Sequence, residues 1–168
     1  GISRIVIEKG ITRIGNNSFV GLLNLMSIDL PEGLTEIGKG AFSDCNDERL
    51  EEITFPNSLI KIEDSAFAGC SGLATPVFGE NSGLQTIGDH AFKNTGLVKV
   101  TIPASVKNLG TDVFGNCGSL EELNVSEGNT VYASDAGVFY SKDMKNLYLC
   151  PWNKQGTSYK IPSGVTII

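Results

Sequence analysis

A phenylalanine recurs along this chain at nearly constant spacing, with successive gaps of 23, 25, 25 and 22 residues. The five copies are Phe19, Phe42, Phe67, Phe92 and Phe114. An apolar triad spaced L-x-x-I-x-I follows several of them, as in Leu50, Ile53 and Phe55. A repeat period in the twenties indicates a solenoid of stacked turns, in which each turn buries its apolar residues against its neighbours.

Each repeat contains the parts of one solenoid turn. The triad predicts a short strand whose alternate residues point inward, and the apolar stretch that follows, such as 34–37, crosses to the opposite wall. We expect the Ala-Phe segment to form a single helical or 3₁₀ turn. The triad spacing is the skeleton of a leucine-rich repeat, whose strands form one parallel sheet on the concave side. The predicted fold class is therefore α/β, a right-handed leucine-rich-repeat solenoid that is strand-rich with short helical turns.

We predict a single solenoid over residues 1–168. Its units are repeats at about 11–33, 34–58, 59–83, 84–105 and 106–128, a β insert at about 129–159 and a truncated repeat at 160–168. Alternating apolar residues separated by turn-forming residues predict that the insert is a strand meander with hairpins. Two departures interrupt the pattern. Residues 46–49 lengthen one loop by two residues. Pro76 lacks the N–H that would donate to a neighbouring strand, so we expect a local flaw in the sheet there. Gly1 resembles a residue left over from an expression vector, and residues 165–168 resemble the opening of another repeat. We therefore expect this chain to be a piece of a longer protein.

The repeat resembles that of the BspA-like leucine-rich-repeat family. The resemblance is carried by Leu50-x-x-Ile53-x-Phe55-Pro56-x-x-Leu59-x-x-Ile62-x-x-x-Ala66-Phe67-x-x-Cys70. The insert, with its D-x-G-V-x-Y core and late Y-x-I-P, is similar to a longer unit that interrupts the repeats in many such chains. The resemblance covers nearly the whole chain. It implies a bacterial or protozoan surface protein that makes binding contacts, secreted or held at the cell surface, and it implies no catalytic residues.

The charge and cysteine patterns exclude several classes of protein. The net charge is −6 and the 13 Lys and Arg form no basic stripe, so we expect no nucleic-acid partner. No apolar run approaches the roughly 20 residues of a spanning helix, so we expect no membrane insertion of this fragment. Cys45, Cys70 and Cys117 each lie three residues after a repeat phenylalanine, which predicts buried free thiols. The chain has no CxxC and one histidine, His90, so we expect neither a metal site nor a cofactor.

Two carboxylate pairs, Glu51-Glu52 and Glu121-Glu122, are the candidates for catalysis. They lie three turns apart, which at the spacing of parallel strands is about 14 Å. That separation exceeds the limit of about 9.5 Å for an inverting glycosidase, so we interpret the pairs as solvated strand positions. Asn-x-Ser matches at 16–18 and 124–126 are interpreted as chance. We therefore predict no enzyme activity, and a carbohydrate-active enzyme is the least favoured reading.

The outward positions of the triads form the candidate binding face. The predicted ligand-binding residues are Ser27, Asp29, Glu52, Thr54, Thr75, Lys99, Thr101, Glu122 and Asn124. This concave face is mildly acidic and poor in aromatics, whereas the insert holds several aromatic residues, which either contact a ligand or bury the hairpin core. The predicted function is noncatalytic adhesion to a host or bacterial surface protein or glycan. The alternative is a structural spacer that presents another domain, and the oligomeric state is left open.

Overall fold

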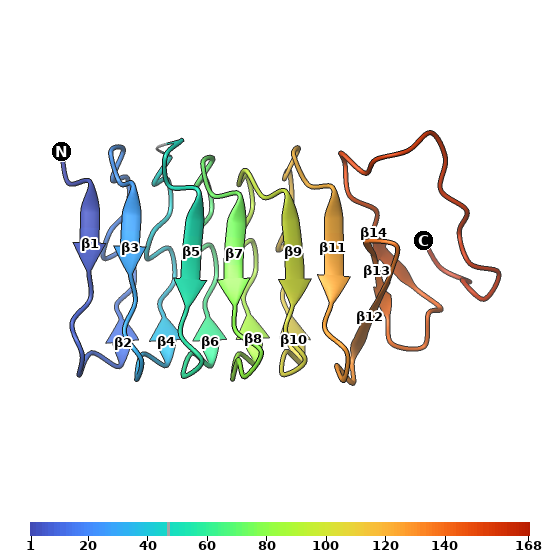
Figure 1. Cartoon of the computed structure of the whole chain (residues 1–168), viewed down its shortest axis with the longest axis horizontal. Helices are drawn as coiled ribbons and strands as arrows, with labels where there is room; N and C mark the ends of the chain where they lie inside the picture. Colours follow the sequence, from blue (N-terminus) through green and yellow to red (C-terminus); the bar gives the residue numbers. More distant parts are fainter. Residues whose placement is uncertain (47) are drawn as a thin grey trace.

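Two rows of parallel strands run along the molecule, and the chain passes from one row to the other in each turn (Figure 1). The computed structural model describes residues 1–46 and 48–168, so the centre of the lengthened loop at 46–49 lies outside the described residues. The first row holds the triad strands: β1 (Arg4–Val6), β3 (Ser27–Asp29), β5 (Glu52–Phe55), β7 (Thr75–Phe78), β9 (Lys99–Ile102) and β11 (Glu122–Val125). The second row is one five-stranded parallel sheet: β2 (Arg13–Ile14), β4 (Glu36–Ile37), β6 (Lys61–Ile62), β8 (Thr86–Ile87) and β10 (Asn108–Leu109).

The triad row is divided into pairs. Hydrogen-bonded ladders join β1 to β3, β5 to β7 and β9 to β11, and no ladder joins one pair to the next among the described residues. Pro76 keeps its register opposite Ile53 of β5, so the flaw expected at this proline lies on the other side of β7. There the Val98 N–H donates to the Ala74 carbonyl at 3.1 Å in place of a ladder. A similar break separates β3 from β5, where the lengthened loop enters the row.

The Ala-Phe segments form a third wall, and the prediction of short helical turns is wrong. No helix occurs in 1–46 or 48–168. The residues two before and two after each repeat phenylalanine have a left-handed φ of 52° to 78°: Asn17, Gly40, Ser65, His90, Asp112, Gly21, Asp44, Gly69, Asn94 and Asn116. In the third turn, the N–H groups of Ser65, Phe67 and Gly69 donate to carbonyls of the next turn at 2.8 to 2.9 Å. Because alternate donors bond between turns, they cannot close the i→i−4 bonds of a helix.

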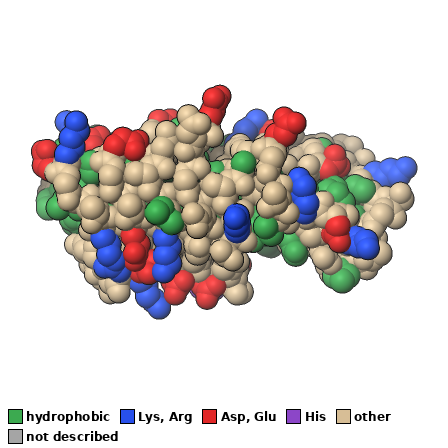
Figure 2. Space-filling view, turned by 90° about the horizontal axis from the view of Figure 1, so that it is seen from below, with side chains coloured by type: hydrophobic (Ala, Val, Ile, Leu, Met, Phe, Trp, Pro, Cys, Tyr) green, Lys and Arg blue, Asp and Glu red, His purple; other side chains and the backbone are tan. Residues whose placement is uncertain are grey.

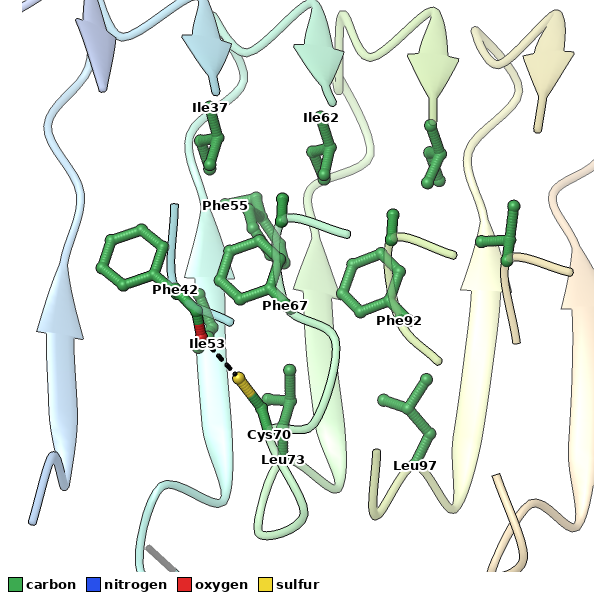
Figure 3. Close-up of a cluster of buried hydrophobic side chains, with 14 of the residues drawn as sticks. Ile37, Phe42, Ile53, Phe55, Ile62, Phe67, Cys70, Leu73, Phe92 and Leu97 are labelled. Carbon is green, nitrogen blue, oxygen red and sulfur yellow. Dashed lines mark hydrogen bonds between the residues drawn. The ribbon is translucent and has the colours of Figure 1, made fainter. Parts of the chain in front are cut away.

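The phenylalanine column fills the centre of the stack, as predicted. Phe42, Phe67 and Phe92 are fully or almost fully buried, and their rings stack at centroid distances of 5.4 and 5.5 Å (Figure 3). Phe55 meets Phe67 edge-on at 5.5 Å. Phe19, the first phenylalanine of the column, is half-buried and stacks on Phe42 at a centroid distance of 5.1 Å.

The cysteine slot is a buried hydrogen-bonding position. The three slot thiols are free, as predicted, and each donates to the carbonyl of the phenylalanine one turn earlier. The Sγ–O distances are 3.2 Å for Cys45, 3.1 Å for Cys70 (Figure 3) and 3.2 Å for Cys117. Burial raises the pKa of the Cys117 thiol. Thr95 fills the slot of the fourth turn and donates to the carbonyl of Phe92 in its own turn at 2.7 Å.

The insert is an antiparallel meander, as predicted. Its strands are β12 (Tyr132–Asp135), β13 (Val138–Ser141) and β14 (Leu147–Leu149). The insert extends the triad row, because the Leu123 N–H donates to the Gly137 carbonyl at 2.8 Å. It also covers the edge of the second row, where the Leu109 N–H donates to the Tyr132 hydroxyl at 3.0 Å.

Asn129 marks the residue at which the chain leaves the regular repeat. It lies three residues after Ser126, in the slot that apolar residues fill in the earlier turns: Leu34, Leu59, Leu84 and Val106. Asn129 is 1% exposed, and its side-chain amide makes four hydrogen bonds. It donates to the carbonyls of Pro103 and Val106 at 3.0 Å and accepts from the N–H groups of Val131 and Tyr132. The amide therefore joins the last regular turn to the first residues of the insert.

Candidate functional site

The outward side chains of the triad strands form one surface, which we call the triad-strand face. All nine predicted ligand-binding residues lie on it, exposed or half-buried, because burial alternates along each strand. The parallel register aligns them across neighbouring strands: Glu52 lies opposite Thr75, Lys99 opposite Glu122, and Thr101 opposite Asn124.

Ion pairs occupy the two ends of the triad-strand face. Arg4 contacts Asp29 at 2.6 Å and Lys99 contacts Glu122 at 2.9 Å. The hydrogen bond from Lys99 lowers the pKa of Glu122, whose other oxygen accepts from the Asn124 amide at 3.1 Å. These pairs are exposed, so their main effect is to orient side chains rather than to stabilise the fold. The central strands β5 and β7 carry no ion pair among the described residues, so their outward groups are free to contact a ligand.

A groove of about 490 Å³ opens on the triad-strand face over β3, β5 and β7. The predicted residues that line it are Ser27, Asp29, Glu52 and Thr54. Glu32 and Asn57 close one end, where the Asn57 N–H donates to the Glu32 carboxylate at 3.2 Å. The groove coincides with the break between β3 and β5, and three carboxylates make it acidic.

A second hollow, a polar cleft of about 450 Å³, lies where β11 meets the insert. Glu122 and Asn124 line it from β11, and Ser134, Lys154 and Gln155 line it from the insert. The structure thus gathers four predicted residues at the groove and two at the cleft. Thr101 lines a third hollow of about 660 Å³, together with Glu80 and Ser126. Thr75 and Lys99 line none of the three. Lys154 and Gln155 are not indicated by the sequence, because no repeat pattern places the 150–158 loop beside β11.

Several bonds hold the 150–158 loop against β11 and the meander. The Asn153 N–H donates to the Leu120 carbonyl at 2.8 Å, and Gln155 donates to the Glu121 carboxylate at 3.2 Å. Lys154 donates to the Ala136 carbonyl. The loop is therefore positioned by backbone and side-chain bonds, and it forms a fixed wall of the cleft.

The carboxylate pairs are not brought together. Glu52 and Glu122 lie on β5 and β11, with β7 and β9 between them in the row, and Glu121 accepts from Gln155. Within the described ranges, no three His, Cys, Asp or Glu side chains form a group that could hold a metal ion.

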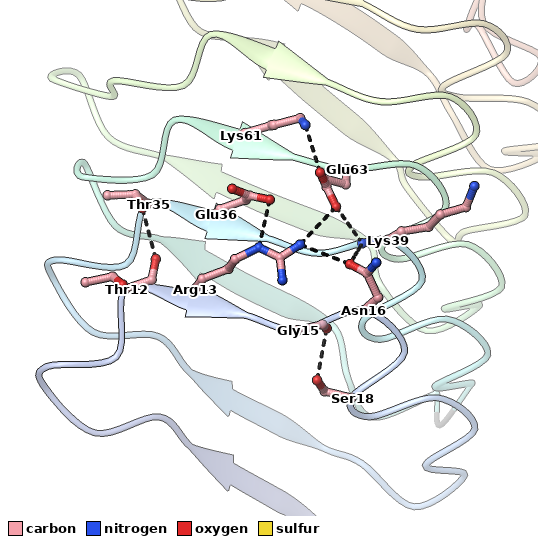
Figure 4. Close-up of polar contacts among 10 residues, drawn as sticks. All are labelled: Thr12, Arg13, Gly15, Asn16, Ser18, Thr35, Glu36, Lys39, Lys61 and Glu63. Carbon is pink, nitrogen blue, oxygen red and sulfur yellow. Dashed lines mark hydrogen bonds and ion pairs between the residues drawn. The ribbon is translucent and has the colours of Figure 1, made fainter.

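The opposite row carries a network of ion pairs between turns. Arg13 donates to Glu36 at 2.9 Å and contacts Glu63 at 3.4 Å, while Lys61 donates to Glu63 at 2.7 Å (Figure 4). The Glu63 carboxylate also accepts from the Lys39 N–H at 3.1 Å. The contacts of Arg13 and of the Lys39 N–H join different turns, whereas Lys61 and Glu63 belong to the same turn. Figure 2 shows acidic and basic side chains interspersed on the visible side of the molecule, without a large area of one sign.

Comparisons with known proteins agree with this architecture. The family model described as the BspA type leucine rich repeat region matches in six copies, over residues 1–121 and 45–159. The solved structure of the pneumococcal vaccine antigen PcpA is 37% identical, with a TM-score of 0.89 over 97% of this chain and 40% of its own. A leucine-rich repeat protein from Eubacterium ventriosum is 29% identical, with a TM-score of 0.85 over 99% of this chain and 43% of its own.

The leucine-rich repeat protein of T. pallidum is 32% identical, with a TM-score of 0.66 over 71% of this chain and 57% of its own. This chain therefore spans less than two thirds of the length of these structures. No curated protein matches it. Among the residues that the structure describes, no helix is long and apolar enough to cross a membrane.

Proposed function

Because this chain belongs to the BspA-type leucine-rich-repeat family, we propose that it is a noncatalytic binding module of a bacterial surface protein. The leucine-rich-repeat family and fold are generally noncatalytic, and the carboxylates of this chain are dispersed along the solenoid. The ligand is a protein or glycan of a host or bacterial surface, bound through the triad-strand face.

The observation that carries this proposal is that the groove and the polar cleft lie on one face. The groove and the polar cleft are both lined by outward triad residues, and the strands that present them are fixed by backbone ladders. A pre-organised surface binds with little loss of conformational entropy. The acidic groove favours a ligand with basic or hydroxyl groups, since like charges across an interface are unfavourable.

The test is a pull-down of the chain against panels of surface proteins and glycans, followed by charge reversal. We expect Glu52→Lys and Glu122→Lys to weaken the captured ligand at least about ten-fold, which corresponds to about 1.4 kcal/mol. Lys107→Glu, an exposed change beside the second row, is the control and should bind normally. All three should keep the thermal unfolding midpoint, since exposed substitutions usually change stability by less than about 0.5 kcal/mol. If Lys107→Glu loses binding and the two glutamate variants do not, the ligand does not bind through the triad-strand face.

A structural spacer is the second candidate, and the short coverage of the solved relatives favours it. The chain spans 40% and 43% of the first two, so a larger protein has room for a separate functional domain. If the chain is a spacer, Glu52→Lys and Glu122→Lys leave ligand binding by the longer protein unchanged. Deletion of one whole turn, in contrast, changes the distance over which the attached domain is presented.

A further inference from the structure

The outward side chains of β11 are more enclosed than those of the other triad strands. The polar residues at the outward positions of β5, β7 and β9 are all exposed: Glu52, Thr54, Thr75, Lys99 and Thr101. Glu122 and Asn124 take the same positions on β11, and both are half-buried. On this strand, the triad-strand face is therefore the floor of the polar cleft rather than an open surface.

One wall of the polar cleft is the turn between β12 and β13, which lies directly against β11. Gly137 in this turn has a left-handed φ of 76°, and a Cβ atom on it would come within 2.9 Å of Cγ of Glu122. The Gly137 carbonyl accepts from the Leu123 N–H at 2.8 Å, and the Ser134 hydroxyl accepts from the Val125 N–H at 2.9 Å. Glycine allows both the left-handed backbone and the close approach, so this wall is fixed against the Glu122 side chain.

The other wall, the 150–158 loop, is held by a chain of hydroxyl groups. Because a carboxylate only accepts, the Tyr159 hydroxyl donates to Asp135 at 3.0 Å and accepts from the hydroxyl of the buried Tyr140 at 2.7 Å. The Lys154 ammonium lies 5.2 Å from the centroid of the Tyr159 ring and donates to the Ala136 carbonyl. These contacts tie the loop to the β12–β13 turn. The D-x-G-V-x-Y and Y-x-I-P residues of the sequence thus build the walls of the polar cleft.

The polar groups that line the cleft are only partly used. Glu121 accepts through Oε1, and its Oε2 has no partner among the residues that the structure describes. Asn124 and Gln155 bond only through their NH₂ groups there, so Oδ1 of Asn124 and Oε1 of Gln155 are unpaired. The Ser134 hydroxyl accepts from Val125, and its own hydrogen has no acceptor within 1–46 and 48–168. The cleft therefore offers three acceptors and one hydroxyl donor to a ligand.

The charges at the polar cleft cancel. Glu121, Glu122 and Lys154 line it, and Lys99 pairs with Glu122 at 2.9 Å, so two carboxylates meet two ammonium groups. The acidic groove, in contrast, holds three carboxylates. A basic peptide gains no charge attraction at a neutral cleft. It also finds no pocket for an apolar anchor, because the largest apolar side chain among the described residues that line the cleft is Ala136.

We propose that the polar cleft binds a short uncharged saccharide. Hydroxyl groups of the sugar donate to Glu121, Asn124 and Gln155, and another accepts from Ser134. A hydroxyl both donates and accepts, so a sugar ring matches this mixed set of groups, and the fixed walls lower the entropy lost on binding. The volume of about 450 Å³ lies within the range of small-molecule sites. This inference rests on the proposed function and narrows it, since it makes the ligand of this part of the triad-strand face a glycan.

The test is titration of the ¹⁵N-labelled chain with the methyl glycosides of glucose, galactose, mannose and N-acetylglucosamine, and with lactose and maltose. We expect at least one of these saccharides to shift the side-chain amide signals of Asn124 and Gln155, with a dissociation constant of about 0.1–10 mM. The affinity is modest because none of the described residues that line the cleft is an aromatic on which a sugar could stack. Since the acceptors are fixed in position, the epimers should differ at least about five-fold in affinity.

Four variants of the chain locate the contact. Asn124→Ala and Gln155→Ala should each weaken the saccharide at least about five-fold, because a hydroxyl of the ligand loses its acceptor. Glu52→Gln in the acidic groove is the control and should bind the saccharide normally. Tyr159→Phe leaves all the proposed ligand contacts in place and should weaken the saccharide by loosening the 150–158 loop. Hydrogen exchange should then speed up at the Asn153 N–H, which bonds to Leu120, and stay unchanged at the Phe67 N–H.

The saccharide assignment is overturned if none of these sugars shifts the two amide signals at about 50 mM, five times the weakest expected dissociation constant. It is also overturned if all epimers bind equally, if Glu52→Gln weakens the sugar as much as Gln155→Ala does, or if trilysine shifts the signals and the sugars do not. If the chain then still captures a surface ligand that Glu52→Lys releases, the proposed function stands and only the saccharide assignment falls.

Discussion

Single residues decide where the regular repeat stops. Asn129 is a polar residue in a slot that is apolar in the other turns, and burial of an amide is tolerated only when its hydrogen bonds are made. All of its donors and acceptors make hydrogen bonds. These bonds replace the apolar contacts of the slot and fix the direction in which the chain leaves the repeat toward the insert.

Asn129→Asp should therefore be among the most destabilising isosteric changes in this chain. A carboxylate cannot donate to the carbonyls of Pro103 and Val106, so we expect a loss of about 2–5 kcal/mol at pH 7. Burial raises the pKa of the introduced carboxyl above its unfolded value, and the deficit should shrink as pH falls and the group regains a proton. Urea unfolding at pH 7 and pH 4 measures both effects. The control is Asn108→Asp at an exposed position, and equal deficits in the two variants would contradict the role given to Asn129.

The four cysteines should divide by reactivity. Cys45, Cys70 and Cys117 are buried, and the Cys45 thiol together with burial raises the pKa of Cys70. The hydrogen bond with Cys70 lowers the pKa of Cys45, but burial keeps the alkylating reagent away from all three slot thiols. Alkylation of the native chain should therefore modify Cys150, which is exposed, and leave the slot thiols until the chain unfolds. Mass spectrometry after iodoacetamide treatment without reductant checks this. A disulfide, or rapid modification of Cys70, would show that the slot is open.

At the scale of elements, the third wall depends on residues that tolerate a left-handed backbone. Most such positions hold Gly, Asn or Asp, which adopt positive φ at low cost, but Ser65 does so at φ 54°. Its side chain has no hydrogen-bond partner within 1–46 and 48–168, so no side-chain hydrogen bond there offsets the strain.

Ser65→Asn should stabilise the chain by about 0.5–1 kcal/mol, and Ser65→Val should destabilise it by more than about 1 kcal/mol, because a β-branched side chain clashes at this φ. Denaturant unfolding of the two variants provides the measurement. If the valine variant is as stable as the asparagine variant, the segment does not hold the left-handed conformation.

The phenylalanine column should show a gradient of stability along the stack. Phe67 is fully buried between two stacked rings, so Phe67→Ala should cost about 3–5 kcal/mol. Phe19 is half-buried and stacks on one ring, that of Phe42, with the centroids 5.1 Å apart. Phe19→Ala should therefore lower the free energy of unfolding by about 1–2 kcal/mol. Equal losses in the two variants would mean that the ends are as well packed as the centre.

On the scale of the whole molecule, stability is roughly a sum over interfaces between neighbouring turns, because most contacts of a turn are with the turns beside it. The contact between Arg13 and Glu63 is an exception that spans two turns. In the N-terminal turns, the ion pairs of Glu63 with Arg13 and Lys61 also contribute to the free energy of unfolding. The hydrogen bond from Lys61, with other nearby donors, lowers the pKa of Glu63 below its ordinary value of 4.5.

A carboxyl group whose pKa is lowered by folding stabilises the folded state at pH values above its pKa in the unfolded chain. This contribution is lost as the pH falls through its pKa in the folded chain. We therefore expect Glu63→Gln to cost about 1 kcal/mol at pH 7 and progressively less below about pH 4.5. Unfolding free energies between pH 7 and pH 3 test this, with Glu80→Gln as the exposed control. A deficit that grows toward low pH would contradict the assignment.

The amino-acid sequence by itself determined the period, the buried phenylalanine column, the outward residues of the triads and the strands of the insert. These features depend on which positions are apolar, and in a solenoid the apolar pattern dictates burial one turn at a time. The tertiary structure alone decided the rest. The third wall is not helical because its alternate N–H groups meet carbonyls one turn away. The thiol hydrogen bonds, the four bonds of Asn129, the groove and the polar cleft likewise depend on lateral contacts between residues that lie far apart in the chain. No local sequence pattern shows which groups these contacts bring together.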